Sequence, residues 1–213
     1  MDADPDPGRL RGAPAVIRTG ILLAAGASRR FGPQDKLLAP LDGSPLIHHA
    51  ADAMRRATLD HRIAVITSDA LVPHLAGFTL CRIAPGLQSD SLHAGLRAAA
   101  GAHRLLIALG DMPDVTAAHL DAVLARATDD APACSHDGAR PMPPACFPAT
   151  MLPQLMALKG DQGAGRLLAD LPPDRMLPAP GLLRDVDRPA DLVRRAGGPG
   201  GRVSPPGPPR DAI

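Results

Sequence analysis

Short apolar runs alternate with amphipathic segments along most of the chain, and this rhythm restricts the fold more than any other feature. The runs at residues 17–25, 62–67, 78–84 and 104–110 are apolar almost throughout, instead of alternating apolar and polar residues. Strands of this kind are typical of a parallel sheet that is covered by helices on both faces. We therefore expect an α/β protein with a mostly parallel sheet.

The segments between these runs predict helices. Ser44 followed by Pro45 is a typical helix start, with Ser44 as the N-cap, and apolar residues then recur at helical spacing. Residues 91–100 show a second helical pattern, for which Ser89 and Ser91 are candidate N-caps. Helices in these places would complete β-α-β units.

The second half of the chain is less regular. Thr116 can cap a helix, but residues 138–168 hold many Pro and Gly residues before further helical segments. Residues 182–187 predict a strand that ends in acidic residues, followed by a short helix starting near Pro189. No internal repeat is visible.

The composition of the two ends differs from that of the body. Residues 1–15 are rich in Pro, Gly and Asp, and residues 197–213 are mostly Gly and Pro. Such segments bury little apolar surface, so we expect two disordered tails around one domain at 16–196. Neither a signal-peptide pattern nor an apolar run of membrane-spanning length occurs, and we expect a cytoplasmic protein.

Charge and aromatic content argue against two classes of partner. The formal net charge is +1 and aromatic residues make up 1% of the chain, which disfavours nucleic-acid and membrane binding. Three widely spaced cysteines, Cys81, Cys134 and Cys146, form no zinc-binding pattern. We expect them to be small buried apolar residues in a reducing compartment.

The loop after the first apolar run has the composition of a phosphate-binding loop. Gly26 and Gly32 allow close backbone approach, and Arg29, Arg30 and Lys36 supply positive charge. The loop matches neither the Walker A pattern nor GxGxxG. Its chemistry alone fits a phosphate site and a solvated turn equally well.

Acidic residues follow two other predicted strands. Asp111 comes directly after Gly110 at the end of an apolar run, where it can hold a divalent cation or simply serve in a turn. Asp185 and Asp187 are two residues apart and would share one face of a strand. In open α/β sheets, ligands bind at the carboxyl ends of strands, so all three are candidate site residues.

Four segments in one order resemble a known enzyme family. "LLAAGASRRFG" with the following Lys36, "GSPLI", "LGDMPDV" and "DVDRPADL" resemble the nucleotidyltransferases that load a nucleotide onto molybdopterin, within the sugar-phosphate nucleotidylyltransferase superfamily. The resemblance covers about residues 18–195. It implies a Rossmann-like three-layer α/β/α nucleotidyltransferase fold. It also implies Mg²⁺-dependent transfer of a nucleoside monophosphate from an NTP to the phosphate of molybdopterin or molybdenum cofactor, with release of pyrophosphate.

The resemblance implies a role for each matching residue. Arg30, Lys36 and Asp111 would be catalytic, and Asp111 and Asp187 would hold Mg²⁺, with Asp185 a less certain neighbour. Arg30 would contact the triphosphate together with Ser28. The residues implied in nucleotide binding are Leu23, Ala24, Ala25, Gly26, Ser28, Arg30 and Lys36.

The resemblance also bears on the substrates. Ala24-Ala25-Gly26 stands where the guanylyl branch typically carries Ala-Gly-Gly, and the "DVD" segment resembles the cytidylyl branch, so CTP is the expected donor. Asp161, Gly163 and Ala164 match a cytidylyl-branch motif that we expect near the acceptor. Residues 141–144 depart from the Gly-His-Pro of many members. The implied partners are CTP or GTP, a molybdopterin-type acceptor, and a molybdoenzyme or its chaperone as recipient.

Two other functions remain open from the sequence. One is guanylyl transfer or sugar-phosphate nucleotidylyl transfer within the same superfamily. The other is a carrier that holds a pterin cofactor for a partner enzyme without catalysis. The combination of Arg30, Lys36, Asp111 and Asp187 argues against a carrier, because cofactor binding alone would not need all four.

Overall fold

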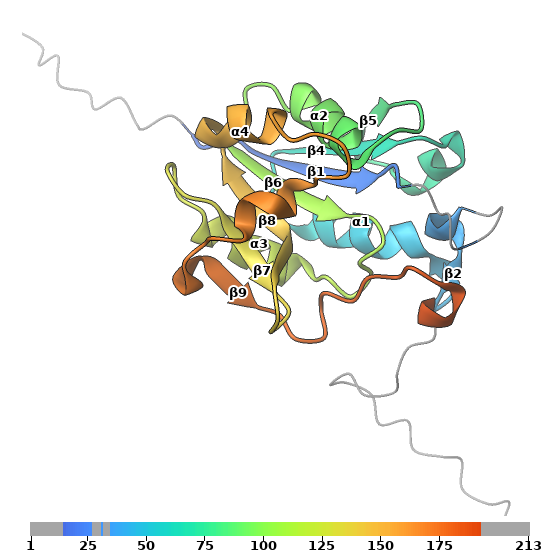
Figure 1. The fold of residues 1–213 in the computed structure, drawn as a ribbon. Helices are drawn as coiled ribbons and strands as arrows, with labels where there is room; N and C mark the ends of the chain where they lie inside the picture. The colour runs from blue at the N-terminus through green and yellow to red at the C-terminus, as the bar shows by residue number, and fades with distance from the viewer. Residues whose placement is uncertain (1–14, 27–30, 32–34, 193–213) are drawn as a thin grey trace, which may run out of the picture.

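A seven-stranded sheet forms the middle layer of the protein in the computed structural model, which describes residues 15–26, 31 and 35–192 (Figure 1). The strand order is β5-β4-β1-β6-β8-β7-β9. The strands are β1 (Arg18–Ala24), β4 (His61–Ile66), β5 (Thr79–Arg82), β6 (Arg104–Leu109), β7 (Ala133–His136), β8 (Pro141–Pro148) and β9 (Met176–Pro178).

The first four strands in the chain that join this sheet are parallel, as the sequence predicts. β1 pairs with β4 and with β6, and β4 pairs with β5, all in parallel register. β8 runs antiparallel to both β6 and β7, and β9 is parallel to β7. The sheet is therefore mostly parallel, with the antiparallel pairs confined to the half built from the second part of the chain.

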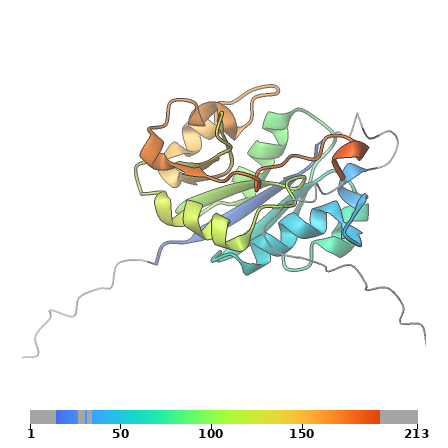
Figure 2. The ribbon, with the colours of Figure 1, turned by 90° about the horizontal axis from the view of Figure 1, so that it is seen from below.

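Helices cover both faces of the sheet (Figure 1). α1 (Leu46–Arg56) and α3 (Ala117–Arg126) pack on one face, where Figure 2 shows them side by side, and α2 (Gln88–Ala98) and α4 (Leu152–Met156) pack on the other. β1 contributes to both layers, since Leu22 belongs to the first core and Ile21 to the second. This explains why its sequence is apolar on both faces.

Shorter elements connect these layers. A small hairpin of β2 (Pro40–Leu41) and β3 (Ser44–Pro45) precedes α1. The 3-10 helices are η1 (Lys36–Leu38), η2 (Asp69–His74), η3 (Ala149–Met151), η4 (Ala164–Leu168), η5 (Pro173–Arg175) and η6 (Pro189–Leu192).

Two predicted helix starts are wrong. Ser44 does not cap α1, because it pairs with Leu41 across a turn whose central residues, Asp42 and Gly43, have φ values of 50° and 82°. The hairpin keeps Ser44 extended, and α1 begins at Leu46.

Ser89 and Ser91 do not cap α2 either. The helix begins earlier, at Gln88, and the Asp90 carboxylate accepts a hydrogen bond of 2.9 Å from the Leu87 N–H. The Ser91 hydroxyl donates to the Gln88 carbonyl oxygen at 2.8 Å, within the helix.

The strand predicted at residues 182–187 is also wrong, since this segment has no regular secondary structure. The short helix expected after it is present as η6, which begins at Pro189. The cap of α3 is confirmed, because the Thr116 hydroxyl oxygen accepts a hydrogen bond from the His119 N–H.

The cysteines fit the expectation of buried, unpaired residues in part. Cys134 and Cys146 are buried and Cys81 is half-buried, and all three are free. Burial raises the pKa of the Cys146 thiol to about 12, so this thiol stays protonated at neutral pH.

The predicted tails fall mostly outside the described part of the chain. Residues 1–14 and 193–213 are not described, so the boundaries at 16 and 196 stay predictions. Among the described residues, no helix has the length and apolar character that a bilayer crossing requires.

Gly95 brings the backbone of α2 close to the sheet. A Cβ at this position would lie 2.5 Å from Cγ2 of Ile21 and 3.1 Å from Cγ2 of Val65. We expect Gly95→Val to lower the free energy of unfolding by about 1–3 kcal/mol, the usual cost of overpacking a core. Valine favours a helix more than glycine does, so helix propensity does not account for such a loss; Ala98→Val, on the exposed side of the same helix, shows what a valine costs where nothing crowds it. Equal losses in urea unfolding would contradict the close packing.

Candidate functional site

The predicted site residues gather at the carboxyl ends of the two central parallel strands. β1 and β6 are in register up to Leu23 and Leu109, and the Gly110 N–H extends this pairing by donating to the Leu23 carbonyl at 2.9 Å. Asp111 follows directly, so it lies at the edge of the sheet where the first loop begins. This is the edge at which open α/β sheets bind ligands.

Lys36 lies at the centre of this edge and is nearly buried, with 11% of its side chain exposed. Its ammonium group donates to Asp111 Oδ2 at 2.6 Å, to the Val186 carbonyl oxygen at 3.1 Å and to Asp187 Oδ1 at 3.4 Å. η1, which begins with Lys36, is capped by the Asp35 carboxylate. Lys36 thus joins segments that are about 75 and 150 residues away along the chain.

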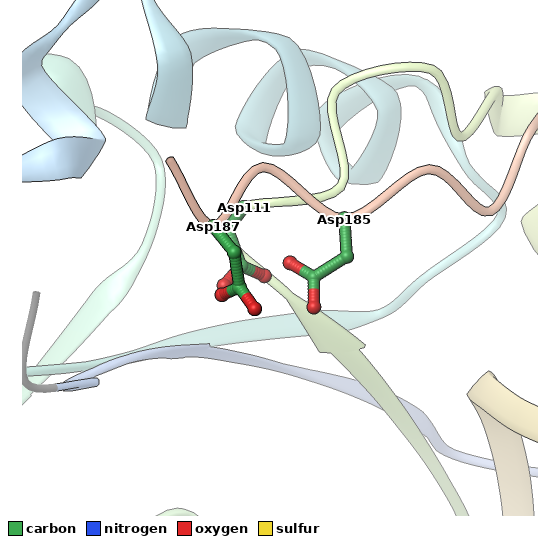
Figure 3. Close-up of side chains that lie close together, drawn as sticks. All are labelled: Asp111, Asp185 and Asp187. Atoms are coloured by element: carbon green, nitrogen blue, oxygen red, sulfur yellow. The ribbon is translucent and has the colours of Figure 1, made fainter. Parts of the chain in front are cut away.

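Three carboxylates lie together beside Lys36 (Figure 3). Asp111, Asp185 and Asp187 each offer one oxygen, and these oxygens lie within 4.8 Å of one another. Asp185, which the resemblance left uncertain, is part of this group. Asp111 Oδ1 is buried without a hydrogen-bond partner in the described part of the chain.

The charges of the cluster shift the pKa values of its members. Partial burial and the Asp111 carboxylate raise the pKa of Asp185 to about 6, although the side chain still has an exposed surface at the rim. Burial alone would lower the pKa of Lys36, but Asp111, with Asp185 and Asp187, holds it above its ordinary value. Lys36 is therefore a fixed positive charge at neutral pH, and it cannot act as a general base.

The donor set of the cluster fits a hard divalent cation. Carboxylate oxygens are the ligands that Mg²⁺ and Mn²⁺ prefer, and three carboxylates that close together repel one another without a cation. Lys36 offsets only part of this charge. No donor among the described residues satisfies Asp111 Oδ1, which therefore offers a ligand atom to a cation. The residues present therefore fit the metal that the resemblance implies.

A cavity of about 400 Å³ opens beside the cluster. The segment Leu23, Ala24, Ala25 and Gly26 forms one wall, and its predicted contact with a nucleotide stays a prediction. Ser28 and Arg30 lie outside the described residues, so their predicted contacts with the triphosphate stay predictions. The remaining lining residues are Lys36, Leu37, Gly86, Leu87, Gln88, Ser91, Leu109, Asp111, Asp161 and Asp185.

Sequence reasoning missed part of this wall. Leu87, Gln88 and Ser91 belong to the start of α2, and half of the Leu87 surface is exposed although it is a large apolar residue. Sequence reasoning treated Ser91 mainly as a helix cap. The sequence offered one weak signal, the helix start predicted at Ser89 and Ser91, because a helix N-terminus can meet an anionic ligand.

A second cavity of about 340 Å³ adjoins the first. The two share Leu23, Gln88, Leu109 and Asp185, so Asp185 borders both. The far wall comes from the start of β8 and from η4, and its lining includes Arg140, Pro141, Met142, Pro143, Gly163, Ala164, Gly165 and Arg166. Gly163 and Ala164 of the "GDQGAG" segment therefore lie beside the candidate site, and their expected place near an acceptor stays a prediction.

Comparison with known proteins gives consistent matches over most of the chain. A family model described as the MobA-like NTP transferase domain matches residues 20–176. The purine catabolism protein PucB of Bacillus subtilis is 35% identical over 198 residues, covering 83% of this chain and 96% of PucB. A probable molybdenum cofactor guanylyltransferase of Pyrococcus horikoshii is 32% identical over 103 residues, which is 48% of this chain and 53% of that protein.

Solved structures match the fold over a similar length. A nucleotidyl transferase from Methanothermobacter superposes with a TM-score of 0.73 at 25% identity, covering 82% of this chain and 94% of that one. Rv0371c of Mycobacterium tuberculosis, solved as a complex with manganese, has a TM-score of 0.68 at 26% identity and covers 81% of this chain and 94% of its own. The family match includes Lys36 and Asp111 and ends before Asp185.

Proposed function

The chain belongs to the MobA-like NTP transferase family and is a nucleotidyltransferase, and we propose that it transfers a cytidylyl group from CTP to the phosphate of a molybdopterin-type acceptor, releasing pyrophosphate with the help of Mg²⁺. One observation carries this proposal. A charged, nearly buried lysine lies with three clustered carboxylates at the carboxyl ends of two parallel strands, and the lysine, Asp111 and Asp185 line a cavity there. This arrangement suits the transfer of a nucleotidyl group from a nucleoside triphosphate to a phosphate monoester, both of which are anions.

The reaction needs no general base from the protein. The acceptor is a phosphate monoester, which is already ionised at neutral pH. One of its oxygens attacks the α-phosphorus of CTP, a new P–O bond forms, and the bond from the α-phosphorus to the oxygen bridging the β-phosphate breaks. Pyrophosphate leaves with that electron pair. The barrier is mainly repulsion between anions and the entropy of positioning.

Lys36 and the carboxylate cluster would reduce the repulsion between the phosphates of the two substrates. Lys36 stays protonated and supplies a fixed positive charge to the phosphates at the reacting centre. Asp111, Asp185 and Asp187 would hold the cation. When bound, Mg²⁺ supplies Lewis-acid stabilisation of the charge that develops on the phosphate oxygens. Residues 23–26, with the start of α2, hold the base and ribose in the larger cavity.

The adjoining cavity is our candidate for the acceptor. It borders the carboxylate cluster through Asp185, so a phosphate bound there lies beside the nucleotide. Arg140 and Arg166 line it and bring two positive charges to its far wall. Guanidinium groups recognise phosphate oxygens in a bidentate manner. The "GDQGAG" segment would then lie between donor and acceptor, because its Asp161 lines the larger cavity and its Gly163 and Ala164 line the smaller one.

Arg140 and Arg166 provide a test of this placement. Because both are exposed, we expect each change to alanine to raise the KM for the acceptor by about tenfold, the lower end for a hydrogen bond to a charged group. The KM for CTP should stay within about twofold, since neither residue lines the nucleotide cavity. Steady-state kinetics with each substrate varied in turn measures both constants. A larger change in the KM for CTP would contradict the assignment of the two cavities.

The donor nucleotide rests on Ala25 and on the "DVD" segment. GTP is the second candidate, because the Pyrococcus relative is named a guanylyltransferase and matches half of this chain. Pyrophosphate release from CTP, GTP, ATP and UTP, measured with the acceptor and Mg²⁺, separates the two. We expect release with CTP alone. Release with GTP alone would keep the mechanism and overturn the choice of donor.

A further inference from the structure

Two of the three clustered carboxylates belong to a segment that is not part of the sheet. Asp185 and Asp187 lie in residues 182–188, which have no regular secondary structure. Val186, between them, is fully buried, its N–H donates to the Asp111 carbonyl at 3.1 Å, and its carbonyl accepts from Lys36. These contacts fix one residue, and they leave open what fixes the two carboxylates on either side of it.

Asp191 fixes the backbone on the Asp187 side. One oxygen of its carboxylate, Oδ2, accepts hydrogen bonds from the Asp187 N–H at 3.0 Å and from the Arg188 N–H at 2.8 Å. Both bonds are charge-assisted, because the acceptor is ionised. Asp191 therefore sets the direction in which Asp187 leaves the backbone.

Arg184 fixes the backbone on the Asp185 side. Its Nε donates to Asp114 Oδ2 at 2.7 Å, and its Nη1 donates to the Asp191 carbonyl oxygen. Asp114 belongs to the same loop as Asp111, three residues after it. Arg184 thus ties the segment to the loop that carries Asp111 and also to the residue that orients Asp187.

This group of residues lies outside the reacting centre. None of Asp114, Arg184 and Asp191 lines the nucleotide cavity or the acceptor cavity. Three carboxylates that repel one another would move apart on a loosely held segment. Asp114, Arg184 and Asp191, which we call the clamp, would keep these oxygens within range of a single cation. Contacts of this kind behind metal ligands commonly decide metal affinity.

We propose that Arg184 and Asp191 are positioning residues, which hold Asp185 and Asp187 against Asp111 so that the three carboxylates bind one divalent cation. This inference rests on the metal-binding part of the proposed function. It assigns no direct contact with substrate or metal to either residue. Their loss therefore weakens metal binding first and affects turnover through the metal.

Direct binding of Mn²⁺ tests the clamp without any substrate. Electron paramagnetic resonance of free Mn²⁺, titrated into the full-length protein, gives the Kd for the wild type, Arg184→Gln, Asp191→Ala and Asp191→Asn. We expect the first two variants to raise the Kd by about 10–100-fold, as is usual for contacts behind metal ligands. Asp191→Asn keeps an oxygen that can accept both N–H groups, so it should recover most of the affinity.

Arg82→Gln is the matched control. Arg82 Nε pairs with Asp69 Oδ1 at 2.7 Å, the same chemistry and distance as the pair of Arg184 with Asp114. Its Kd for Mn²⁺ should equal that of the wild type. In steady-state kinetics, the Arg184 and Asp191 variants should show a raised apparent KM for Mg²⁺, with kcat largely recovered at saturating Mg²⁺.

The outcomes separate the clamp from the function it rests on. Binding of Mn²⁺ by the wild type and equally by Arg184→Gln and Asp191→Ala would overturn the clamp and leave the metal site standing. Failure of the wild type itself to bind Mn²⁺ would overturn the metal site and the clamp together. A thermal unfolding curve for each variant shows that the folded protein is being titrated. If Arg184→Gln does not fold, the Kd values of Asp191→Ala and Asp191→Asn test the clamp.

Discussion

Replacement of Lys36 by methionine is expected to lower kcat by about 10²–10³-fold, the usual cost of removing one fixed donor from a developing oxyanion. Methionine keeps most of the length of the side chain, being one atom shorter, and removes the charge. We expect this loss because Lys36 is nearly buried, and three carboxylates keep it protonated beside the proposed reacting centre. Steady-state rates at saturating CTP, acceptor and Mg²⁺, corrected for folded protein, provide the measurement.

Lys159→Met is the control for this change. Lys159 is an exposed lysine that lines neither cavity, so its loss should leave kcat unchanged. The Lys36 variant should also bind Mn²⁺ at least as tightly as the wild type, because the carboxylates lose a competing positive charge. Normal turnover of the folded Lys36 variant would contradict its proposed catalytic role.

Replacement of Asp111 by asparagine is expected to have a comparable effect, a loss of about 10³-fold, since several kcal/mol of charge stabilisation depend on the metal. Asp111 combines two tasks, because Oδ2 accepts from Lys36 while Oδ1 is buried without a hydrogen-bond partner in the described residues. Asparagine is nearly isosteric, so the fold should persist. The variant should also show little dependence of the remaining rate on Mg²⁺.

Chelation of the metal provides the companion measurement. EDTA should abolish turnover of the wild type, and excess Mg²⁺ should restore it. Asp69→Asn, at a surface ion pair, is the control and should behave as the wild type. A wild-type rate that survives EDTA, or an Asp111 variant with the wild-type response to Mg²⁺, would contradict the assignment of a metal to this cluster.

The parallel half of the fold was predictable because its signal is local. Each strand near the centre is apolar on both faces, as Ile21 and Leu22 of β1 illustrate by entering opposite cores. The helix starts were less predictable. Ser44 has the chemistry of an N-cap, but the pairing of β2 with β3 across Asp42 and Gly43 overrides that preference.

The site was predictable as far as strand ends could reveal it. Asp111 follows a recognisable buried strand, and parallel strands bring their carboxyl ends to one edge of the sheet. The segment of Asp185 and Asp187 was predicted as a strand, which it is not, yet its carboxylates reach the same edge. They do so through long-range contacts of Val186 and Arg184, and no local pattern encodes such contacts.

The walls of the two cavities were the least predictable part. Leu87, Gln88 and Ser91 line the larger cavity because α2 begins there, and Gly95 sets how closely that helix packs on the sheet. Gln88 borders both cavities, and its carboxamide lies so close to Gly163 that a Cβ there would approach it to 2.8 Å. Such relations appear only when distant segments are packed together.

Transfer of label from CTP tests the central claim most directly. The protein is incubated with Mg²⁺, a molybdopterin-type acceptor and CTP labelled with ³²P at either the α- or the γ-phosphate, and the products are separated. The proposed reaction predicts α-label in the pterin product and γ-label in pyrophosphate. γ-Label in the pterin product, or release of α-labelled CMP without any pterin adduct, would contradict nucleotidyl transfer at this site.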